Sequence, residues 1–270
     1  MINFHKYGFL DVKRLTNLVE EKNFWLYIFN PVWLFIHNEL YNPQICFENN
    51  AIFIKIDFMD LKNVYIEPIG IKPLDGIEII KNELRNQNLD ANLICYSYPI
   101  GNLVLYENQF FQTKVFALEE IIANKKSRRN AKKFIKAHKS SYLKKMKKDD
   151  FKDVIEFFQE YNLKNQLDHF NYFKTLNSLN LILQHLYELD FKAMLVIDDS
   201  KIIGLAVGNV ISNTMYLDLL LCLDEKAVDY LIIEFCKNAL LYSRYIASET
   251  SLLDKYKEYK IEKCYTTFRL

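Results

Sequence analysis

Glycine and proline are scarce in this sequence, with six and five residues among 270. Lysine, isoleucine, asparagine, phenylalanine and tyrosine are abundant, a bias typical of AT-rich coding sequences. The large overall number of lysines and asparagines is therefore weak evidence for any function. No low-complexity linker or internal repeat interrupts the chain. Half of the residues are hydrophobic, so the chain can bury one large core or two modest ones.

An excess of charge of one sign is also missing. The 35 basic and 34 acidic residues leave a formal net charge of +1. No field over the whole molecule would attract nucleic acid or a membrane surface. Any such attraction must come from a local cluster.

The cysteines do not have the pattern of a disulfide framework. They are odd in number, scattered and set among apolar residues, which favours buried thiols in a reducing compartment over disulfides. No pair has the spacing of zinc ligands, and we expect neither a metal site nor a permanently bound cofactor. The five are Cys46, Cys95, Cys222, Cys236 and Cys264.

Targeting and membrane-spanning patterns are missing as well. Residues 1–10 lack the charged start and apolar core of a secretory signal. The most apolar run, residues 24–36, contains Asn30-Pro31 and falls short of the ~20 residues that a transmembrane helix needs. We therefore expect no transmembrane segment, a core helix pair over this run and a cytoplasmic protein.

Helices and strands alternate in the first half of the chain. A hairpin turn is expected at residues 49–51, because asparagine tolerates positive φ. Apolar positions at Ile77, Ile80 and Leu84 give one face of a helix. The patterns predict helices at 11–21, 31–40 and 74–85, and strands at 45–48, 52–56, 63–67 and 92–97.

The second half shows a more regular order. Two helices precede three strands that are joined by polar turns, which predicts an antiparallel meander. A long helix, a strand, a short helix and a last strand follow. The helices are expected at about 151–158, 170–187, 227–242 and 252–259, and the strands at 142–146, 193–197, 202–210, 215–222, near 245 and at 264–269.

A basic segment, residues 125–148, lies between the halves and holds twelve Lys or Arg and no acidic residue. Its first part predicts a helix over 126–139. Such a helix is either an ordinary solvated face or a surface that binds phosphates, to which arginine adds bidentate donors. We expect Ala131, Phe134, Ile135 and His138 to point inward, and Arg128, Arg129, Lys132, Lys133 and Lys136 outward.

The order of the second half is that of a GCN5-related N-acetyltransferase lobe. Three segments add weight: Phe29-Asn30-Pro31-Val32-Trp33, Pro68-Ile69-Gly70, and the basic run from Ser127 to Phe134. In this order and spacing the chain resembles bacterial proteins similar to the C-terminal catalytic domain of phosphatidylglycerol lysyltransferase. The family's C-terminal pattern is only partly met by Ser248-Glu249, Leu252-Leu253 and Lys255-Tyr256-Lys257, since its Gly, Arg and Pro are missing.

The resemblance implies an α/β (α+β) fold with two tandem acetyltransferase-like lobes, each a mixed, mostly antiparallel sheet flanked by helices. It places a degenerate acyltransferase-like lobe at residues 1–124, a basic connecting helix and strand at 125–148, and a second acyltransferase-like lobe at 149–270. The missing C-terminal residues mean that lysyl transfer to a lipid does not follow. The acceptor stays open between a small molecule and a lipid headgroup, and the oligomeric state cannot be read.

The donor of the transferred group could be acyl-CoA or aminoacyl-tRNA. CoA pyrophosphate is usually held by a glycine-rich loop at a helix N-terminus. Here that junction reads Leu223-Asp224-Glu225-Lys226, with no glycine and two carboxylates, although Lys226 leaves a CoA donor possible. Related tandem acyltransferases use aminoacyl-tRNA, which needs basic contacts spread over a surface. The residues expected to bind the donor are Arg128, Arg129, Lys132, Lys133 and Lys226.

Three residues are candidates for the chemistry. The resemblance implies that Lys257 supports the oxyanion and that Glu249 contacts the amine or acts as base, although Lys257 could equally be a surface lysine. Asp218 interrupts an apolar strand, so it lies either at the cleft or on the exposed sheet face. The sequence favours transfer of an acyl or aminoacyl group to an amine or hydroxyl. The alternative is a non-catalytic protein whose basic helix binds RNA or an acidic partner.

Overall fold

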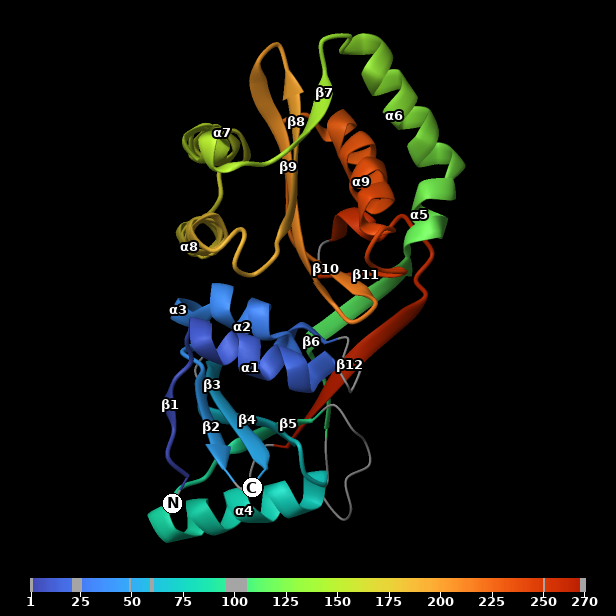
Figure 1. Ribbon diagram of the computed structural model, residues 1–270. Coiled ribbons are helices and arrows are strands. Elements are labelled where there is room, and N and C mark those ends of the chain that lie inside the picture. The colour runs from blue at the N-terminus through green and yellow to red at the C-terminus, as the bar shows by residue number, and fades with distance from the viewer. Residues whose placement is uncertain are drawn as a thin grey trace. The chain divides into compact units, whose positions relative to one another are not determined.

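The computed structural model describes residues 2–20, 26–48, 50–58, 61–95, 106–249 and 251–267. It is a mixed α/β protein in which two mixed sheets are flanked by helices (Figure 1). Contacts divide the chain into two compact units. The first comprises Met1–Thr113 and Glu262–Leu270, and the second Lys114–Ile261.

These boundaries differ from the expected ones at three points. The leading stretch of the first unit ends at Thr113, and residues 114–124 belong to the second unit. The basic segment 125–148 is part of the second unit, because its helix packs against another helix of that unit. The last nine residues join the first unit, because β12 (Lys260–Thr267) pairs antiparallel with β5 (Asn92–Cys95). The expected strand 264–269 thus begins earlier, and its residues 268–269 lie outside the described part.

The first unit contains the strand order β1-β2-β3-β4-β5-β12. The expected hairpin joins β2 to β3, with Asn50 at φ 61°; Asn49 lies outside the described residues. Ile77, Ile80 and Leu84 of α4 pack on the sheet, as their spacing predicts. The elements of this unit besides β5 and β12 are β1 (His5–Lys6), α1 (Phe9–Glu20), η1 (Tyr27–Phe29), α2 (Pro31–Ile36), α3 (Asn38–Tyr41), β2 (Gln44–Glu48), β3 (Ala51–Phe58), β4 (Leu61–Ile69) and α4 (Pro73–Gln87).

The Asn30-Pro31 pair within the first family-like segment starts a helix. The Asn30 side chain caps α2 by accepting from the backbone N–H groups of Val32 and Trp33 at 2.9 and 3.2 Å. Pro31 occupies the first helical position, where no N–H is needed. Within its described part, residues 26–36, the apolar run holds the 3-10 turn η1 and the helix α2 in place of the expected helix pair. The single helix expected at 31–40 is divided into α2 and α3.

The second unit contains the strand order β6-β11-β10-β9-β8-β7. Strands β8 to β10 form the predicted antiparallel meander, and β7 pairs antiparallel with β8. Strand β11 lies parallel to β10 and antiparallel to β6. Strand β6 (Tyr106–Ala117) crosses the boundary, and its residues from Lys114 on belong to this unit. The other elements are α5 (Leu118–Ala123), α6 (Lys125–Ala137), β7 (Tyr142–Lys145), η2 (Lys148–Asp150), α7 (Phe151–Asn165), α8 (His169–Gln184), β8 (Lys192–Asp198), β9 (Lys201–Ile211), β10 (Thr214–Cys222), α9 (Glu225–Ala239), β11 (Tyr245–Ser248) and η3 (Ser251–Leu253).

Helices cover both faces of this second sheet. Helix α9 lies on one face, with α6 outside it, and α7 and α8 lie on the other (Figure 1). The core beneath α9 is built from Leu231, Ile232 and Phe235 of the helix and from sheet residues such as Met215 and Ile246. Helices α8 and α9 therefore cover opposite faces of the second sheet. The candidate site lies on the face that α7 and α8 cover.

The expected helix at 252–259 is wrong. Only a single 3-10 turn forms, at Ser251–Leu253, with the Tyr256 N–H donating to the Leu253 carbonyl at 3.0 Å. The Tyr259 N–H donates to the Val115 carbonyl of β6 at 2.7 Å, so pairing with the sheet has begun before a second helical turn could close. Lys257 accordingly lies in an irregular segment.

The structure also bears on membrane-spanning helices and on the cysteines. Within the described ranges, no helix combines the length and the apolar character needed to span a membrane. Cys46, Cys95, Cys222 and Cys236 are free thiols, whereas the side chain of Cys264 lies outside the described part.

Candidate functional site

Strands β10 and β11 diverge in the middle of the second sheet. Their parallel pairing covers three positions, Thr214 to Tyr216 with Tyr245 to Ala247, and β10 then continues to Cys222 without β11 beside it. A β-bulge in β10 follows at once, between Leu217 and Leu219. Loss of pairing on one side and a bulge on the other open the sheet at this point.

Gly208 of β9 lies opposite the bulge, at a position where the backbone of β10 leaves no room for a side chain. It pairs with Leu217, and a Cβ atom there would stand 2.4 Å from the carbonyl oxygen of Tyr216. The two backbones therefore approach more closely than any side chain allows. The glycine fixes the place where β10 bends.

The bulge decides the direction of Asp218. Leu217 and Leu220 both belong to the core beneath α9, although strict alternation would put residues three apart on opposite faces. The extra residue of the bulge resolves this, and Asp218 lies on the face that α7 and α8 cover. The sequence left two positions open for Asp218, the cleft and the exposed face of the sheet. In the structure Asp218 lies at the bulge, close to the opening of the sheet.

Asp218 is held in a poorly hydrated place. Its Oδ2 accepts from Asn209 Nδ2 at 2.9 Å, while Oδ1 is buried and has no hydrogen-bond partner within the described part of the chain. Burial raises the pKa of Asp218 well above its usual range; the bond from Asn209 opposes this shift and the charge of Glu249 adds to it. The surroundings of Asp218 therefore favour its protonated form.

Glu249 directly follows β11, at the other side of the opening. Ile246 faces the α9 core, so alternation carries Ala247 and then Glu249 to the face of Asp218. The residue is exposed, yet the surrounding protein limits its hydration and raises its pKa to about 7, with Lys174 acting in the opposite direction. Asp218 and Glu249 thus lie on the same face of the sheet, and the charge of Glu249 raises the pKa of Asp218.

Lys174 is a member of this cluster that the sequence analysis does not identify. The buried face of α8 is formed by Ser178, Leu179, Ile182 and Leu183, and Lys174 lies one turn before Ser178 on that face. It is half-buried, and no ion pair or hydrogen bond reaches it from the residues that the structure describes. Lys174, Ser178 and Ile182 follow one another at intervals of four residues. This helical spacing indicates in the sequence that Lys174 shares a face with Ser178 and Ile182.

Lys257 is placed differently. It is exposed, between Tyr256, which is buried in the α9 core, and Glu258, which lies near Lys114. Lys257 is not among the charged groups that shift the pKa of Glu249 or Asp218. The cation that lowers the pKa of Glu249 is Lys174, and an oxyanion role for Lys257 stays a prediction.

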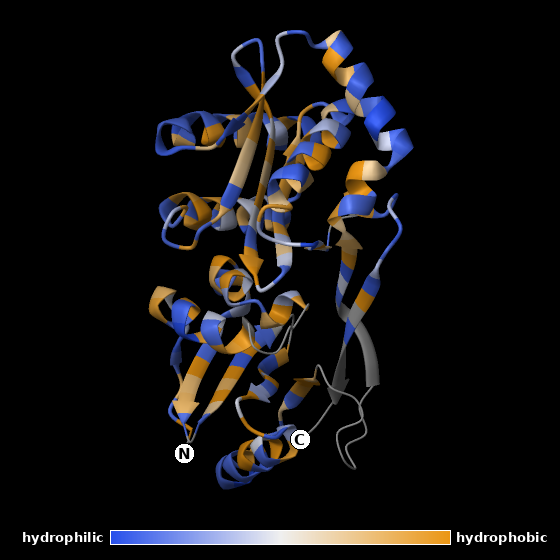
Figure 2. Cartoon of the chain, turned by 45° about the vertical axis from the view of Figure 1, so that its right-hand side comes forward, coloured by the Kyte–Doolittle hydropathy of each residue, from blue (hydrophilic) through white to orange (hydrophobic). Residues whose placement is uncertain are grey.

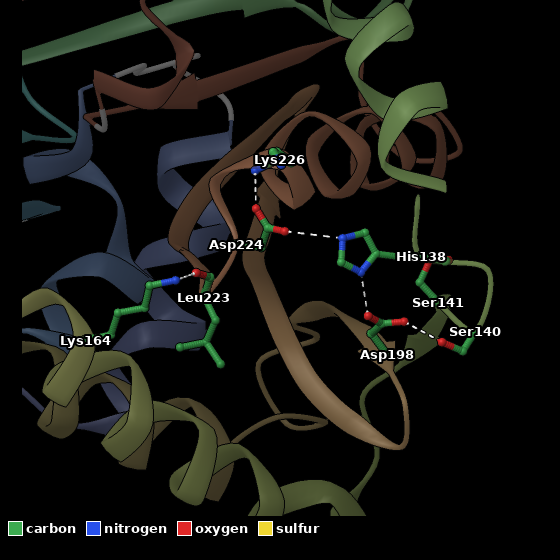
Figure 3. A network of polar contacts seen from close by, with 8 residues as sticks. All are labelled: His138, Ser140, Ser141, Lys164, Asp198, Leu223, Asp224 and Lys226. Atoms are coloured by element: carbon green, nitrogen blue, oxygen red, sulfur yellow. Dashed lines mark hydrogen bonds and ion pairs between the residues drawn. The ribbon is translucent and has the colours of Figure 1, made fainter. Parts of the chain in front are cut away.

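The carboxylate of Asp224 occupies the N-terminal end of α9, where β10 leads into the helix (Figure 3). Asp224 is the N-cap of α9, and its Oδ1 accepts from the Lys226 backbone N–H at 2.8 Å. Its Oδ2 lies 3.5 Å from His138 Nε2. The side chain of Lys226 is exposed and takes no part in these contacts. An anion at this helix end would meet Asp224 and Glu225 first.

His138 joins three elements at this junction (Figure 3). Its Nδ1 lies 2.7 Å from Asp198 Oδ2, at the end of β8, and its ring stacks on Phe134 with centroids 4.5 Å apart. Ser140 donates to the other oxygen of Asp198 at 2.7 Å. The bonds from His138 and Ser140 lower the pKa of Asp198. His138 thus ties the end of α6 to the starts of the β8–β9 turn and of α9.

The outer face of α6 is a basic stripe. Ser127, Ala131 and Phe134 pack inward, whereas Ile135, expected inward, is 44% exposed because the helix touches α9 along a narrower face. Most of α6, at the upper right, is coloured hydrophilic in Figure 2. Six exposed cations without an ion pair in the described part line a recess of about 580 Å³: Lys125, Arg128, Arg129, Lys132, Lys133 and Lys136.

Comparisons with known proteins identify the fold. No protein-family model and no curated protein sequence matches the chain. Among solved structures, a conserved protein of unknown function from Bacteroides thetaiotaomicron superposes with a TM-score of 0.87 at 14% identity, over 98% of this chain and 99% of that one. The C-terminal domain of a putative lysylphosphatidylglycerol synthetase from Agrobacterium fabrum superposes with a TM-score of 0.62 at 12% identity, over 95% and 91%. The chain has the fold of this synthetase domain.

A third structure, FemX, superposes with a TM-score of 0.58 at 7% identity, over 94% of this chain and 95% of that one. These likenesses confirm the fold class and the resemblance that the motifs indicated. At such low identity they establish the fold and leave the reaction to be argued from the site.

Proposed function

We propose that the protein transfers an acyl or aminoacyl group to an amine or hydroxyl acceptor at the opening between β10 and β11. The observation that carries this proposal is the pair of carboxyl groups there, one poised near neutral pH and one buried. A protein of the same fold is named for the synthesis of lysylphosphatidylglycerol, which supports aminoacyl transfer.

Glu249 has the properties of a general base. A base works best when its pKa lies near the working pH, and that of Glu249 is about 7. Its exposed carboxylate accepts the proton of the acceptor amine or hydroxyl as the nucleophile attacks the carbonyl carbon of the donor ester. The carbon–oxygen bond of the ester then breaks, and the leaving oxygen takes up a proton.

Asp218 complements this role as a neutral acid. A buried carboxyl that keeps its proton can donate a hydrogen bond where negative charge develops, and its Oδ1 side is unoccupied by protein donors or acceptors among the described residues. Asn209 holds the other oxygen in place. Lys257 is the candidate for further oxyanion support.

The helix end at α9 disfavours CoA as the donor. Pyrophosphate binding at a helix N-terminus uses free backbone amides and the positive end of the helix dipole. Here the Asp224 carboxylate already accepts from the Lys226 amide, and Glu225 follows it. A pyrophosphate would have to displace Asp224 from both the amide and His138.

The basic stripe of α6 supports a donor carried on RNA. Its six cations are exposed, form one helical face and have no acidic partner in the described part. Backbone phosphates of RNA bind to such surfaces without a glycine loop. Aminoacyl-tRNA, an ester with a long phosphate backbone, fits this surface better than acyl-CoA.

A transfer assay tests the function. The protein is incubated with bulk tRNA charged with ¹⁴C-amino acids and with a low-molecular-weight cell extract, and label in new low-mass products is counted. Glu249→Gln is expected to lower the rate at least 100-fold, as the loss of a general base does. Lys257→Ala is expected to lower it by about 10²–10³ if this residue meets the oxyanion.

Glu188→Gln is the matched control, because Glu188 is exposed in the same unit and forms no contact with the carboxyl pair. Acetyl-CoA in place of charged tRNA is expected to yield no product. Equal rates for wild type and Glu249→Gln would contradict catalysis at this site.

The α6 stripe also supports a second candidate function, non-catalytic binding of RNA, because it needs neither carboxyl group. In that case Arg128→Ala with Arg129→Ala weakens RNA binding, while no labelled product forms with the wild type. Product formation that depends on Glu249 excludes this alternative.

A further inference from the structure

A second hollow, which we call the α9 groove, adjoins the basic stripe of α6. It is lined by α5, α6 and α9, which lie side by side in the second unit (Figure 1). Its lining along α9 runs from Tyr230 to Leu240, a distance of about 15 Å at the rise of an α-helix. Its volume of about 510 Å³ is within the roughly 300–1,000 Å³ of sites for small ligands.

The inside of the α9 groove is largely apolar. Ala131 of α6 and Ile233 of α9 are buried in its walls. Ile135 and Leu240 line it as well, and these two side chains are 44% and 40% exposed. Large aliphatic side chains that remain exposed within one hollow indicate a surface that a ligand covers. The ligand must therefore have an apolar part.

Tyr230 provides an aromatic surface in the groove. Its ring stacks on that of the buried Phe134, with centroids 5.5 Å apart and an interplanar angle of 29°, which holds the ring in place. Tyr230 is half-buried, and no hydrogen bond reaches its hydroxyl group from the residues that the structure describes. A flat ring with polar atoms at its edge matches such a side chain, which offers both an aromatic surface and a hydroxyl group.

The charges at the groove favour an anionic ligand. Glu234 and Lys237 pair with each other at 2.5 Å. Arg128 and Lys132 have no ion pair in the described part, and a single further carboxylate, Glu119, lines the groove. The same two cations also line the recess of the α6 stripe, so the two hollows are continuous at Arg128 and Lys132. A phosphate there is attracted by both side chains.

We propose that the α9 groove binds the base of an unpaired nucleotide, in the RNA whose phosphates lie along the α6 stripe. Arg128 and Lys132 bind the phosphates beside this nucleotide, and Tyr230 with the aliphatic walls holds its base. The bases of a duplex are stacked and paired inside the helix, so only an unpaired base can enter. This inference rests on the RNA-borne donor of the proposed function and names the part of the RNA that is recognised.

The nucleotide in the groove differs from the one that carries the transferred group. The groove lies on the α9 side of the second sheet, whereas Asp218 lies on the face that α7 and α8 cover. The stripe binds phosphates whatever the sequence or pairing of the RNA, and the groove adds a preference for RNA with unpaired bases. The α9 groove thus selects the donor at a distance from the reaction.

Fluorescence anisotropy with two matched RNAs tests the proposal. Both are the same labelled duplex with a short single-stranded 3′ extension, and in one of them the extension is abasic. Their phosphates are identical, so contacts with the stripe are the same for both. The wild type is expected to bind the RNA with bases at least roughly five-fold more tightly, as the stacking of one base provides.

Two variants address the groove without changing its charge. Ile135→Asn makes a wall polar and Tyr230→Leu removes the ring, and each is expected to remove most of the difference between the two RNAs. Arg129→Ala, at a cation that lines the stripe and not the groove, is expected to weaken both RNAs and to preserve their ratio. Leu163→Asn is the matched control, because Leu163 is 78% exposed on α7. Thermal unfolding shows which variants fold, and either groove variant suffices.

The proposal is overturned if the wild type binds both RNAs equally, or if the folded groove variants retain the full difference. Equal binding that still weakens in Arg129→Ala refutes the groove alone and leaves the RNA-borne donor. Absence of binding to both RNAs refutes that donor and the groove with it. If phosphatidylglycerol vesicles bind the wild type but not Ile135→Asn, and the two RNAs bind equally, the groove belongs to an anionic lipid and the proposal fails.

Discussion

Removal of two arginines from the α6 stripe should change the salt dependence of RNA binding by a predictable amount. The six cations lie within residues 125–136, and a helix rises ~1.5 Å per residue, so they extend over about 17 Å. If all six neutralise phosphates of a duplex arm, log K against log salt has a slope of about −5. Affinity then falls roughly 10³-fold between 50 and 200 mM salt.

Arg128→Ala with Arg129→Ala removes two of these contacts, so the slope should become less steep by about 2. Fluorescence anisotropy of labelled tRNA over this salt range measures it. Lys152→Ala with Lys201→Ala is the matched control, because it removes two cations of the same unit that lie away from α6. A wild-type slope near zero, or equal slopes for the arginine variant and the wild type, would refute the role of the stripe.

Three further predictions concern the opened sheet. Transfer should rise about ten-fold from pH 6 to pH 8, because Glu249, with a pKa of about 7, must lose its proton to act as base; a pH–rate profile of Glu249→Gln should lack this rise. Asp218 has a pKa that folding raises, so the folded state holds a proton that the unfolded chain loses above about pH 4, and stability falls as pH rises through that window. Asp218→Asn should therefore raise Tm at pH 7 by about 2–4 °C relative to its effect at pH 4, and the same gain at both pH values would contradict this reasoning. Gly208→Ala should lower the free energy of unfolding by about 1–3 kcal/mol in urea titrations, because its Cβ would meet the Tyr216 carbonyl at 2.4 Å, whereas a neutral result would mean that the bulge is not tightly packed.

Local patterns predicted most elements of the second unit. The meander β8–β10 follows from apolar runs between polar turns, and α6 follows from its inward Ala131 and Phe134. Asp218 is a candidate because a carboxylate within an apolar strand needs a reason, whereas Glu249 is a candidate through the family resemblance alone. These features depend on a few consecutive residues, which sequence reasoning reads well.

The sequence does not predict features that depend on contacts between distant parts of the chain. The side to which Asp218 points is set by a bulge against β9, which alternation within β10 cannot reveal. Lys174 gains relevance only because the fold brings its charge within electrostatic reach of Glu249, which is distant along the chain. The expected helix at 252–259 gave way to pairing with β6, a strand that the sequence analysis did not predict. In each case a tertiary contact outweighed a local preference.

The ionisation of Glu249 in the free protein tests the central claim most directly. A ¹³C NMR titration of glutamate side-chain carboxyls, with the Glu249 signal assigned by its loss in Glu249→Gln, reports the pKa without any substrate. We predict a midpoint of about 7. A midpoint near the ordinary value of about 4.3 would mean that Glu249 is fully hydrated, and would contradict a poised base at the opening of the sheet.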